Sequence, residues 1–265
     1  MNAPLDPAVA PYVLSHTQDG VCQLTLNRGE RYNPLSRAMI AALQGELARI
    51  SAEPSIRCVV LAADGKGFCA GHDLKELQAH ADFAWQQDLF AACHALMLSL
   101  TTLPQPVIAR VHGIATAAGC QLVSMCDLAV AAESARFALP GVNVGVFCTT
   151  PAVGVVRNVG RKRTMEMLLT GEPIDAATAL AWGLVNRVVP TAELDAAIAA
   201  FTRVILARSA SVIAKGKQAF YRQADLGLSA AYDYAGGVMA CSLLEADADE
   251  GIAAFIAKRA PHWGR

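Results

Sequence analysis

Two stretches of small residues, 65–74 (GKGFCAGHDL) and 112–122 (HGIATAAGCQL), leave backbone N–H groups uncovered and available for chemistry. Each follows a short run of apolar, β-branched residues that is typical of a buried strand. The second stretch also leads into a predicted helix, and the N–H groups at a helix N-terminus attract negative charge because the helix dipole adds to direct hydrogen bonding. The pattern therefore predicts backbone donors for a developing oxyanion. The alternative for the second stretch is close packing of a helix on a sheet.

The first stretch has a second interpretation. Gly65, Gly67 and Ala70 fit the G-x-G-x-x-A form of a dinucleotide-binding loop. That fold requires a helix and then a strand that ends in an acidic residue about 20 residues further on. Residues 74–103 follow a helical pattern without such a strand. The sequence therefore favours a backbone anion site over a nucleotide-binding fold.

Several side chains near these stretches are candidates for catalysis. Gln121 can orient a water molecule or donate to a carbonyl group, but its amide exchanges no proton at neutral pH. His72 has a pKa range that suits a general base, or it points away from the site as a loop residue. Cys148 could act as a thiolate nucleophile, or it is an inert packing residue. Asp73 is expected to cap the helix that begins at Leu74.

The composition excludes several classes of protein. The 265 residues are 54% apolar and include 22 basic and 23 acidic side chains. They predict a large globular core and argue against a nucleic-acid partner. No run approaches the roughly 18 apolar residues of a membrane-spanning helix, and the first 20 residues carry no targeting pattern, so we expect a cytoplasmic protein without a membrane partner. The eight cysteines form no C-x-x-C pair, and they predict neither a disulfide framework nor a metal site.

The elements that must position these residues alternate between strand and helix. Strands are predicted at 21–27, 56–63, 106–113 and 127–132, and helices at 37–50, 84–101 and 115–125. After residue 190 the pattern is almost wholly helical. The sequence thus predicts an α/β fold with a C-terminal helical region.

Five segments together resemble the enoyl-CoA hydratase/isomerase, or crotonase, family in order and spacing. They are GFCAGHDLKEL (67–77), PVIARVHGIATAAGCQLVSMCDLAVA (106–131), RFALPGVNVG (136–145), MEMLLTGEPIDAATALAWGLVNRVV (165–189) and EGIAAFIAKRAPHW (250–263). The resemblance implies a crotonase (ClpP-like) spiral of ββα units, acyl-CoA thioester ligands, no covalently bound cofactor, and a homotrimer or a dimer of trimers. It also implies a core at 1–205 that binds acyl-CoA and a helical trimerisation region at 206–265.

The resemblance also assigns candidate site residues. In this family two backbone N–H groups hold the thioester oxygen, and the match places them on Ala70 and Ala118. Phe255 and Lys258 match the C-terminal aromatic residue and lysine that reach the adenine and the 3′-phosphate of CoA, and their i, i+3 spacing would place both on one helix face. The remaining residues expected at the ligand are Cys69, Gly71, His72, Asp73, Leu74, Gly119, Asn143 and Cys148.

The chain departs from the hydratase pattern at both acid/base positions. The two glutamates of the family correspond to Gln121 and Gly141, and neither residue can shuttle a proton. The motifs resemble a branch of the family that keeps the fold and lacks this pair, so ordinary hydratase activity is not expected. Three functions stay open: a hydratase-like lyase with a substitute acid or base, hydrolysis or decarboxylation of a thioester that relies on the oxyanion site, and non-catalytic binding of acyl-CoA.

Overall fold

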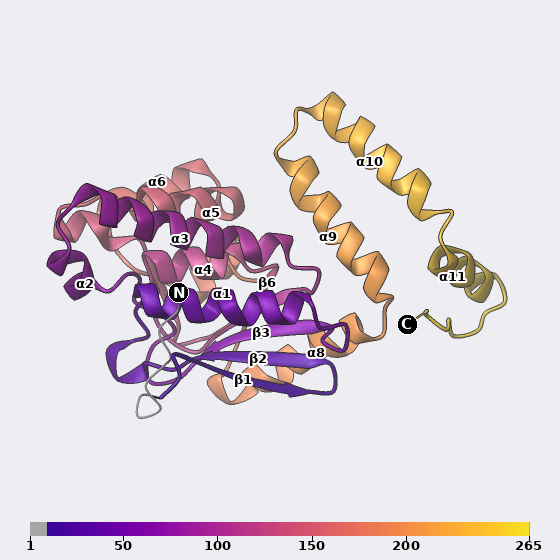
Figure 1. Ribbon diagram of the computed structural model, residues 1–265, viewed down its shortest axis with the longest axis horizontal. Helices are drawn as coiled ribbons and strands as arrows, with labels where there is room; N and C mark the ends of the chain where they lie inside the picture. The colour runs from indigo at the N-terminus through magenta and orange to yellow at the C-terminus, as the bar shows by residue number, and fades with distance from the viewer. Residues whose placement is uncertain (1–9, 265) are drawn as a thin grey trace.

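The main sheet of the computed structural model, which describes residues 10–264, carries the loops of interest (Figure 1). Its six strands lie in the order β1 (Val13–Gln18), β2 (Val21–Leu26), β3 (Cys58–Ala63), β4 (Val107–Val111), β6 (Leu128–Ala132) and β9 (Arg187–Val189). β1 is antiparallel to β2, and the other neighbouring strands are parallel. Parallel strands end at the same edge of a sheet, so the loops after β3 and β4 meet there.

Both faces of this sheet are buried. On β3, Val59 and Leu61 belong to the larger of two cores, whereas Cys58 and Val60 belong to the smaller one on the other face. The helices α1 (Arg37–Ser51), α3 (Phe83–Thr102) and α4 (Ala118–Met125) contribute to the larger core, and α8 (Leu194–Leu206) covers the smaller core. A parallel strand that is buried on both faces is a nearly continuous apolar run. This explains why the sequence shows β3, β4 and β6 so clearly.

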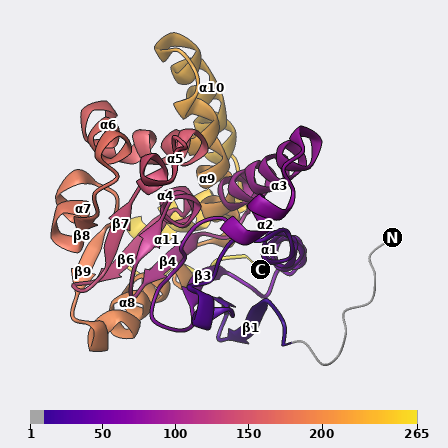
Figure 2. The same ribbon diagram turned by 90° about the vertical axis from the view of Figure 1, so that its left-hand side faces the viewer.

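Shorter elements complete the region around α4. They are the strands β5 (Ala115–Thr116), β7 (Arg136–Ala138) and β8 (Ile174–Asp175), which form a second sheet, and the helices α2 (Leu74–Ala79), α5 (Thr149–Val159), α6 (Arg161–Thr170) and α7 (Ala176–Trp182), with 3-10 turns at Gly29–Arg31, Pro140–Val144 and Thr191–Glu193. α4 packs against both α3 and α5 (Figure 2). The helix that supplies Gln121 is therefore enclosed by its neighbours.

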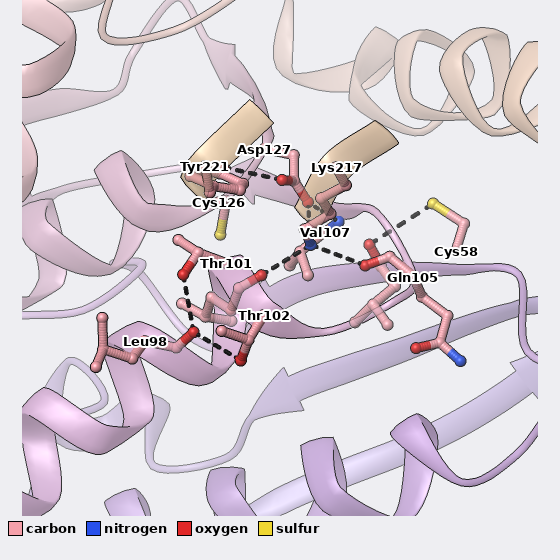
Figure 3. A network of polar contacts seen from close by, with 12 residues as sticks. Cys58, Leu98, Thr101, Thr102, Gln105, Val107, Cys126, Asp127, Lys217 and Tyr221 are labelled. Carbon is pink, nitrogen blue, oxygen red and sulfur yellow. Dashed lines mark hydrogen bonds and ion pairs between the residues drawn. The ribbon is translucent and has the colours of Figure 1, made fainter. Parts of the chain in front are cut away.

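Three C-terminal helices form an arm that extends away from the sheet (Figure 1): α9 (Ala210–Ala224), α10 (Leu228–Ser242) and α11 (Ala246–Ile256). Each contains a single buried residue, Lys217 in α9, Ala231 in α10 and Ala254 in α11. Lys217 anchors α9 to the core through Asp127, at 2.7 Å (Figure 3). The arm thus exposes much apolar surface and is attached to the core mainly through α9.

The predicted α/β class is confirmed, with two differences in detail. The helix expected at 115–125 begins at Ala118, because Ala115 and Thr116 pair with β7 as strand β5. The sequence did not predict β1, since only Val13 in this strand is buried and the alternation of a half-buried strand is missing. α8 ends at Leu206, next to the expected boundary between the core (1–205) and the C-terminal helical region (206–265). Residues 1–9 of the first region and residue 265 of the second lie outside the described residues.

Within residues 10–264, no single helix is both long and apolar enough to cross a membrane. One pair of helices, Thr191–Leu206 with Ala210–Ala224, meets the criteria together by length and composition alone, with a bend of 105° between them.

Candidate active site

The loops after β3 and β4 touch at the carboxyl edge of the sheet. Cys69 forms a parallel bridge with Ala115, and the Thr116 N–H donates to the Cys69 carbonyl oxygen at 2.9 Å. A Cβ atom at Gly119 would overlap this same carbonyl group. Glycine is therefore required at 119 because the first turn of α4 lies directly against the first loop.

The start of α4 presents a free amide. Ala117, which precedes the helix, has φ 48° and ψ −119°, a conformation that a residue with a side chain rarely adopts and that costs about 1–3 kcal/mol. Its own N–H donates to the Ala138 carbonyl oxygen at 2.9 Å. The next amide, that of Ala118, has no hydrogen-bond acceptor among the described residues. Strain held in place at a functional loop is a common way of presenting a backbone donor.

The structure differs from the expected role of Ala70. The Ala70 N–H donates to the Tyr32 carbonyl oxygen at 2.9 Å, so this amide is not free to bind a thioester oxygen. In the part of the chain that the structure describes, the amide of His72, two residues later, makes no hydrogen bond. Gly71 between them has φ +92°, and a Cβ there would lie 3.3 Å from the Ala118 nitrogen. The Gly71 N–H is directed at the Cys69 sulfur, so the amide of His72 is the one we consider free on this loop.

Gln121 lies one turn along α4 and faces a small pocket. The residue is only 6% exposed, and its Oε1 has no hydrogen-bond partner in the described structure. A buried polar atom without a partner is uncommon in native proteins. The pocket has a volume of about 110 Å³ and is lined by Phe90, Cys93, His94, Met97, Leu98, Gln121, Met125, Thr150 and Val153. Gln121 thus places an unsatisfied amide in a largely apolar cavity.

The Gly141 backbone and the Cys148 side chain are in direct contact. The Gly141 N–H donates to Cys148 Sγ at 3.3 Å, and a Cβ at Gly141 would lie 2.9 Å from that sulfur and 2.7 Å from the Val146 carbonyl oxygen. Burial raises the pKa of the Cys148 thiol, and the hydrogen bond from Gly141 offsets this only in part. Cys148 is therefore a neutral packing residue and not an activated nucleophile.

His72 is fixed by the chain segment before α1. Its Nδ1 lies 3.1 Å from the Leu35 carbonyl oxygen, and because a carbonyl only accepts, Nδ1 carries the proton. Nε2 is buried without a partner among the described atoms, and the Phe90 ring stands edge-on at 5.3 Å. Burial lowers the pKa of His72, which the hydrogen bond to Leu35 and the charge of Glu76 offset only in part, so the imidazole is neutral at pH 7.

Asp73 caps α2, as the sequence predicts. Its Oδ1 accepts from the N–H of Lys75 at 3.0 Å, and its Oδ2 pairs with Arg31 at 2.6 Å. Leu74, the first residue of α2, is 59% exposed. Cys69 is fully buried, and burial raises its pKa to about 12, so its thiol is neutral.

Asn143 lies away from the pocket of Gln121. It is exposed, and its side-chain oxygen would be 3.0 Å from a Cβ at Gly171, the residue that ends α6. Thr150, by contrast, lines that pocket.

The C-terminal pair does not share a helix face. α11 ends at Ile256, and Lys258 follows it with φ +52°, so the argument from i, i+3 spacing does not apply. Phe255 is in the last turn of α11 and is 85% exposed. Both residues belong to the arm, apart from the loops that carry His72 and Ala118 (Figure 1).

One structural residue of the site escaped the sequence analysis. Asn33 is fully buried, its Oδ1 accepts from the Arg28 N–H at 2.8 Å, and its Nδ2 donates to the carbonyl oxygens of Asp64 and Gly67 at 2.8 and 3.1 Å. It thereby fixes the loop after β3 and aligns the neighbouring Tyr32 carbonyl with Ala70. An Asn-Pro dipeptide after a predicted strand is a turn signal, and it was the available clue.

Comparison with known proteins decides the family. A family model described as enoyl-CoA hydratase/isomerase matches residues 16–265. The chain belongs to this family. It is 44% identical over 253 residues to enoyl-CoA hydratase domain-containing protein 3, mitochondrial, from Xenopus laevis, covering 96% of this chain and 86% of that protein. It is 42% identical over 245 residues to the human protein of the same name, covering 92% of this chain and 81% of that protein. These relatives confirm the family and the branch that the motifs predict.

Solved structures confirm the crotonase fold. An enoyl-CoA hydratase from Mycobacterium smegmatis matches with a TM-score of 0.94 and 52% identity, covering 96% of this chain and 99% of that one. The human enoyl-CoA hydratase domain-containing protein 3 matches with a TM-score of 0.92 and 41% identity, covering 95% of this chain and 100% of that one.

The expected cytoplasmic location is wrong by this comparison. Relatives from Xenopus laevis, rat, mouse and human, 42% to 44% identical to this chain, are all named mitochondrial. Their names point to a mitochondrial location. The expectation came from the pattern of the first 20 residues, and residues 1–9 lie outside the described structure.

Proposed function

We propose that this protein binds acyl-CoA thioesters, with the carbonyl oxygen of the thioester between the N–H groups of His72 and Ala118. The observation that carries the proposal is the pair of unpaired amides on two loops in direct contact, one of them behind the strained Ala117. Two such donors stabilise the negative charge that develops on a thioester oxygen in acyl-transfer and enolate chemistry. The family of the chain supports the same class of ligand.

Ordinary hydration of an enoyl thioester is not part of this proposal. Gln121 carries no exchangeable proton of suitable pKa, and the space beside Gly141 is filled by Cys148. The site can polarise a thioester and orient a polar group through Gln121. Binding without hydration, or a thioester reaction that depends mainly on oxyanion stabilisation, fits these residues better than a hydratase-like lyase.

We further propose that the arm completes the CoA site in a homotrimer or a dimer of trimers. Large apolar side chains are exposed along all three arm helices: Phe220, Leu228, Tyr232, Met239, Leu244, Ile252, Phe255 and Ile256. Exposed apolar surface of this extent marks an interaction site. In an assembly of this kind, Phe255 and Lys258 would contact the adenine and the 3′-phosphate of CoA. Light scattering at micromolar concentration tests the assembly, and a monomer would contradict it.

A pair of ligands tests the oxyanion site without altering the protein. Butyryl-CoA carries the thioester oxygen, whereas S-butyl-CoA is a thioether that lacks it and keeps the CoA and the four-carbon chain. Isothermal titration calorimetry should show tighter binding of butyryl-CoA, by roughly tenfold for about 1.4 kcal/mol of hydrogen bonding. The variant Ala118→Pro removes one of the two donors and should reduce the difference. Equal affinities in the unaltered protein would contradict the proposed site.

A further inference from the structure

The His72 side chain has a basic nitrogen, Nε2, that makes no hydrogen bond in the described structure. Nδ1 donates to the Leu35 carbonyl oxygen, which fixes the tautomer and leaves the Nε2 lone pair as an acceptor. No described atom donates to Nε2, although it is buried. The ring beside it belongs to Phe90, which is 37% exposed and also lines the pocket of Gln121. The His72 ring is therefore in contact with a side chain that also lines that pocket.

The position of this imidazole follows from the proposed binding mode, on which the inference rests. If the thioester oxygen accepts from the His72 N–H, the acyl C2 carbon is one bond beyond the carbonyl carbon. The C2 carbon is then within the length of the His72 side chain, because that side chain and the donating N–H belong to one residue. Gln121, one turn beyond Ala118 on α4, faces the chain further along.

We propose that His72 is a catalytic base that removes a proton from C2 of the bound acyl thioester. Nε2 takes the proton, the electrons of the C2–H bond form a C1–C2 double bond, and the carbonyl electron pair moves onto the oxygen held by the His72 and Ala118 amides. The imidazolium exchanges its proton with water and returns one to C2. The net change is an exchange of hydrogen between C2 and solvent, which requires no oxidant, reductant or second substrate.

The other titratable groups near the site do not serve this role. The thiols of Cys69 and Cys148 are neutral because burial raises their pKa values. Asp73 is engaged by Arg31 and by the amides of α2. Gln121 does not titrate. His94 lines the pocket of Gln121 on α3, whereas His72 carries an imidazole with one fixed proton and one free lone pair on the same residue as the proposed oxyanion donor.

The surroundings of His72 set the pH range of the exchange. The carboxylate of Glu76 on α2 is the charged group that raises its pKa, the segment before α1 supplies the Leu35 carbonyl, and α3 supplies the uncharged Phe90 ring. Burial outweighs these contacts and lowers the pKa below its ordinary value of 6.5. The neutral base form therefore predominates at pH 7, and it is lost as the pH falls below 6.5.

Hydrogen exchange at C2 of butyryl-CoA in D₂O tests the proposal. Butyryl-CoA has no double bond to hydrate, so mass spectrometry and proton NMR follow deuterium entering C2 alone. The variant His72→Gln keeps the backbone amide and removes the base. Its exchange rate should fall by about 10²- to 10⁴-fold, through kcat and not KM, while calorimetry shows that butyryl-CoA still binds. The control His80→Gln, in which the altered ring is stacked on Trp85 outside the site, should exchange at the native rate.

The outcomes separate this inference from the proposed function. If the unaltered protein binds butyryl-CoA and no deuterium enters C2, or if His72→Gln exchanges at the native rate, His72 is not the base and the binding proposal stands. If butyryl-CoA does not bind at all, the proposed function itself is wrong. Should His72→Gln fail to fold, the pH profile of the unaltered protein decides: the rate must rise through a single group with a pKa below 6.5 and be flat above pH 7, and any other profile overturns the inference.

Discussion

Replacing Lys217 by methionine should be among the most destabilising single changes in the arm. The ammonium group is 7% exposed and uses its three donors on Asp127 Oδ2 at 2.7 Å and on the carbonyl oxygens of Leu100 and Gln105 at 2.8 and 3.0 Å (Figure 3). The Asp127 carboxylate, 16% exposed, also accepts from the Tyr221 hydroxyl at 2.9 Å. One ion pair thus joins α9 to the ends of α3, β4 and β6.

The size of the effect follows from what Lys217→Met leaves behind. Removing one partner of a buried ion pair costs about 3–5 kcal/mol, because the other charge stays buried without compensation. Asp127 keeps the Tyr221 hydroxyl and the Val107 N–H, which donates to it at 2.7 Å, so the lower end of this range applies. We expect a loss of about 3 kcal/mol in the free energy of unfolding.

Urea denaturation followed by circular dichroism, at one fixed protein concentration, measures this loss. Lys215→Met is the matched control, since Lys215 lies on the same helix and its ion pair with Glu245 is exposed, at 48% and 34% of the two side chains. An exposed pair contributes about 0–1 kcal/mol. Adding Asp127→Asn to Lys217→Met should cost less than the sum of the single changes. Equal effects of Lys217→Met and Lys215→Met would refute the reasoning.

Other expectations concern catalysis, CoA binding and pH. Crotonyl-CoA hydration should be at least about a hundredfold slower than the usual 1 to 10³ s⁻¹, and a kcat in that range would show an acid or base that we have not identified. Lys258→Ala should weaken CoA binding at low salt and reduce its salt dependence; unchanged calorimetry would contradict the phosphate contact. The hydrogen bond from Arg259 lowers the pKa of Glu250 from 4.5 to about 2. The ionised Glu250 therefore stabilises the fold above pH 4.5, and this contribution is lost as the pH falls towards 2. In Glu250→Gln, the midpoint of urea denaturation should depend less on pH over that range.

The fold was predictable because its signals are local. β3, β4 and β6 are short apolar runs, and Ser36 accepts from the Met39 N–H at 3.2 Å as a helix cap should. β1 was not predictable in the same way, because an exposed edge strand has no hydrophobic pattern and is held by its pairing with β2. The anchor of α9 was also missed, since its lysine and aspartate are 90 residues apart in the chain.

The sequence indicated which loops lie together, but not which backbone N–H groups in them are free. The motifs indicated two loops that the structure brings into contact, and they placed an expected donor on Ala118, whose N–H is unpaired in the described structure. They could not show that the Ala70 N–H is already bonded, because its acceptor is the Tyr32 carbonyl of a third segment. Backbone hydrogen bonds between distant segments are independent of side-chain type, so no residue pattern records them. The same holds for the free amide of His72.

The packing of the site opposes a glutamate at Gly141 but not at Gln121. At Gly141, even the first carbon of a side chain would press on Cys148 Sγ at 2.9 Å and on the Val146 carbonyl oxygen at 2.7 Å, so a glutamate there requires the loop of 142–148 to move. At Gln121, by contrast, a glutamate has the same size and only its charge is new, buried in a pocket whose lining includes no lysine or arginine to balance it. Reverting Gln121 alone would therefore create a carboxyl group that favours its neutral form, while reverting Gly141 would disturb the backbone itself. Glutamates at these two positions would therefore meet different obstacles, a backbone that must shift at 141 and an unbalanced buried charge at 121.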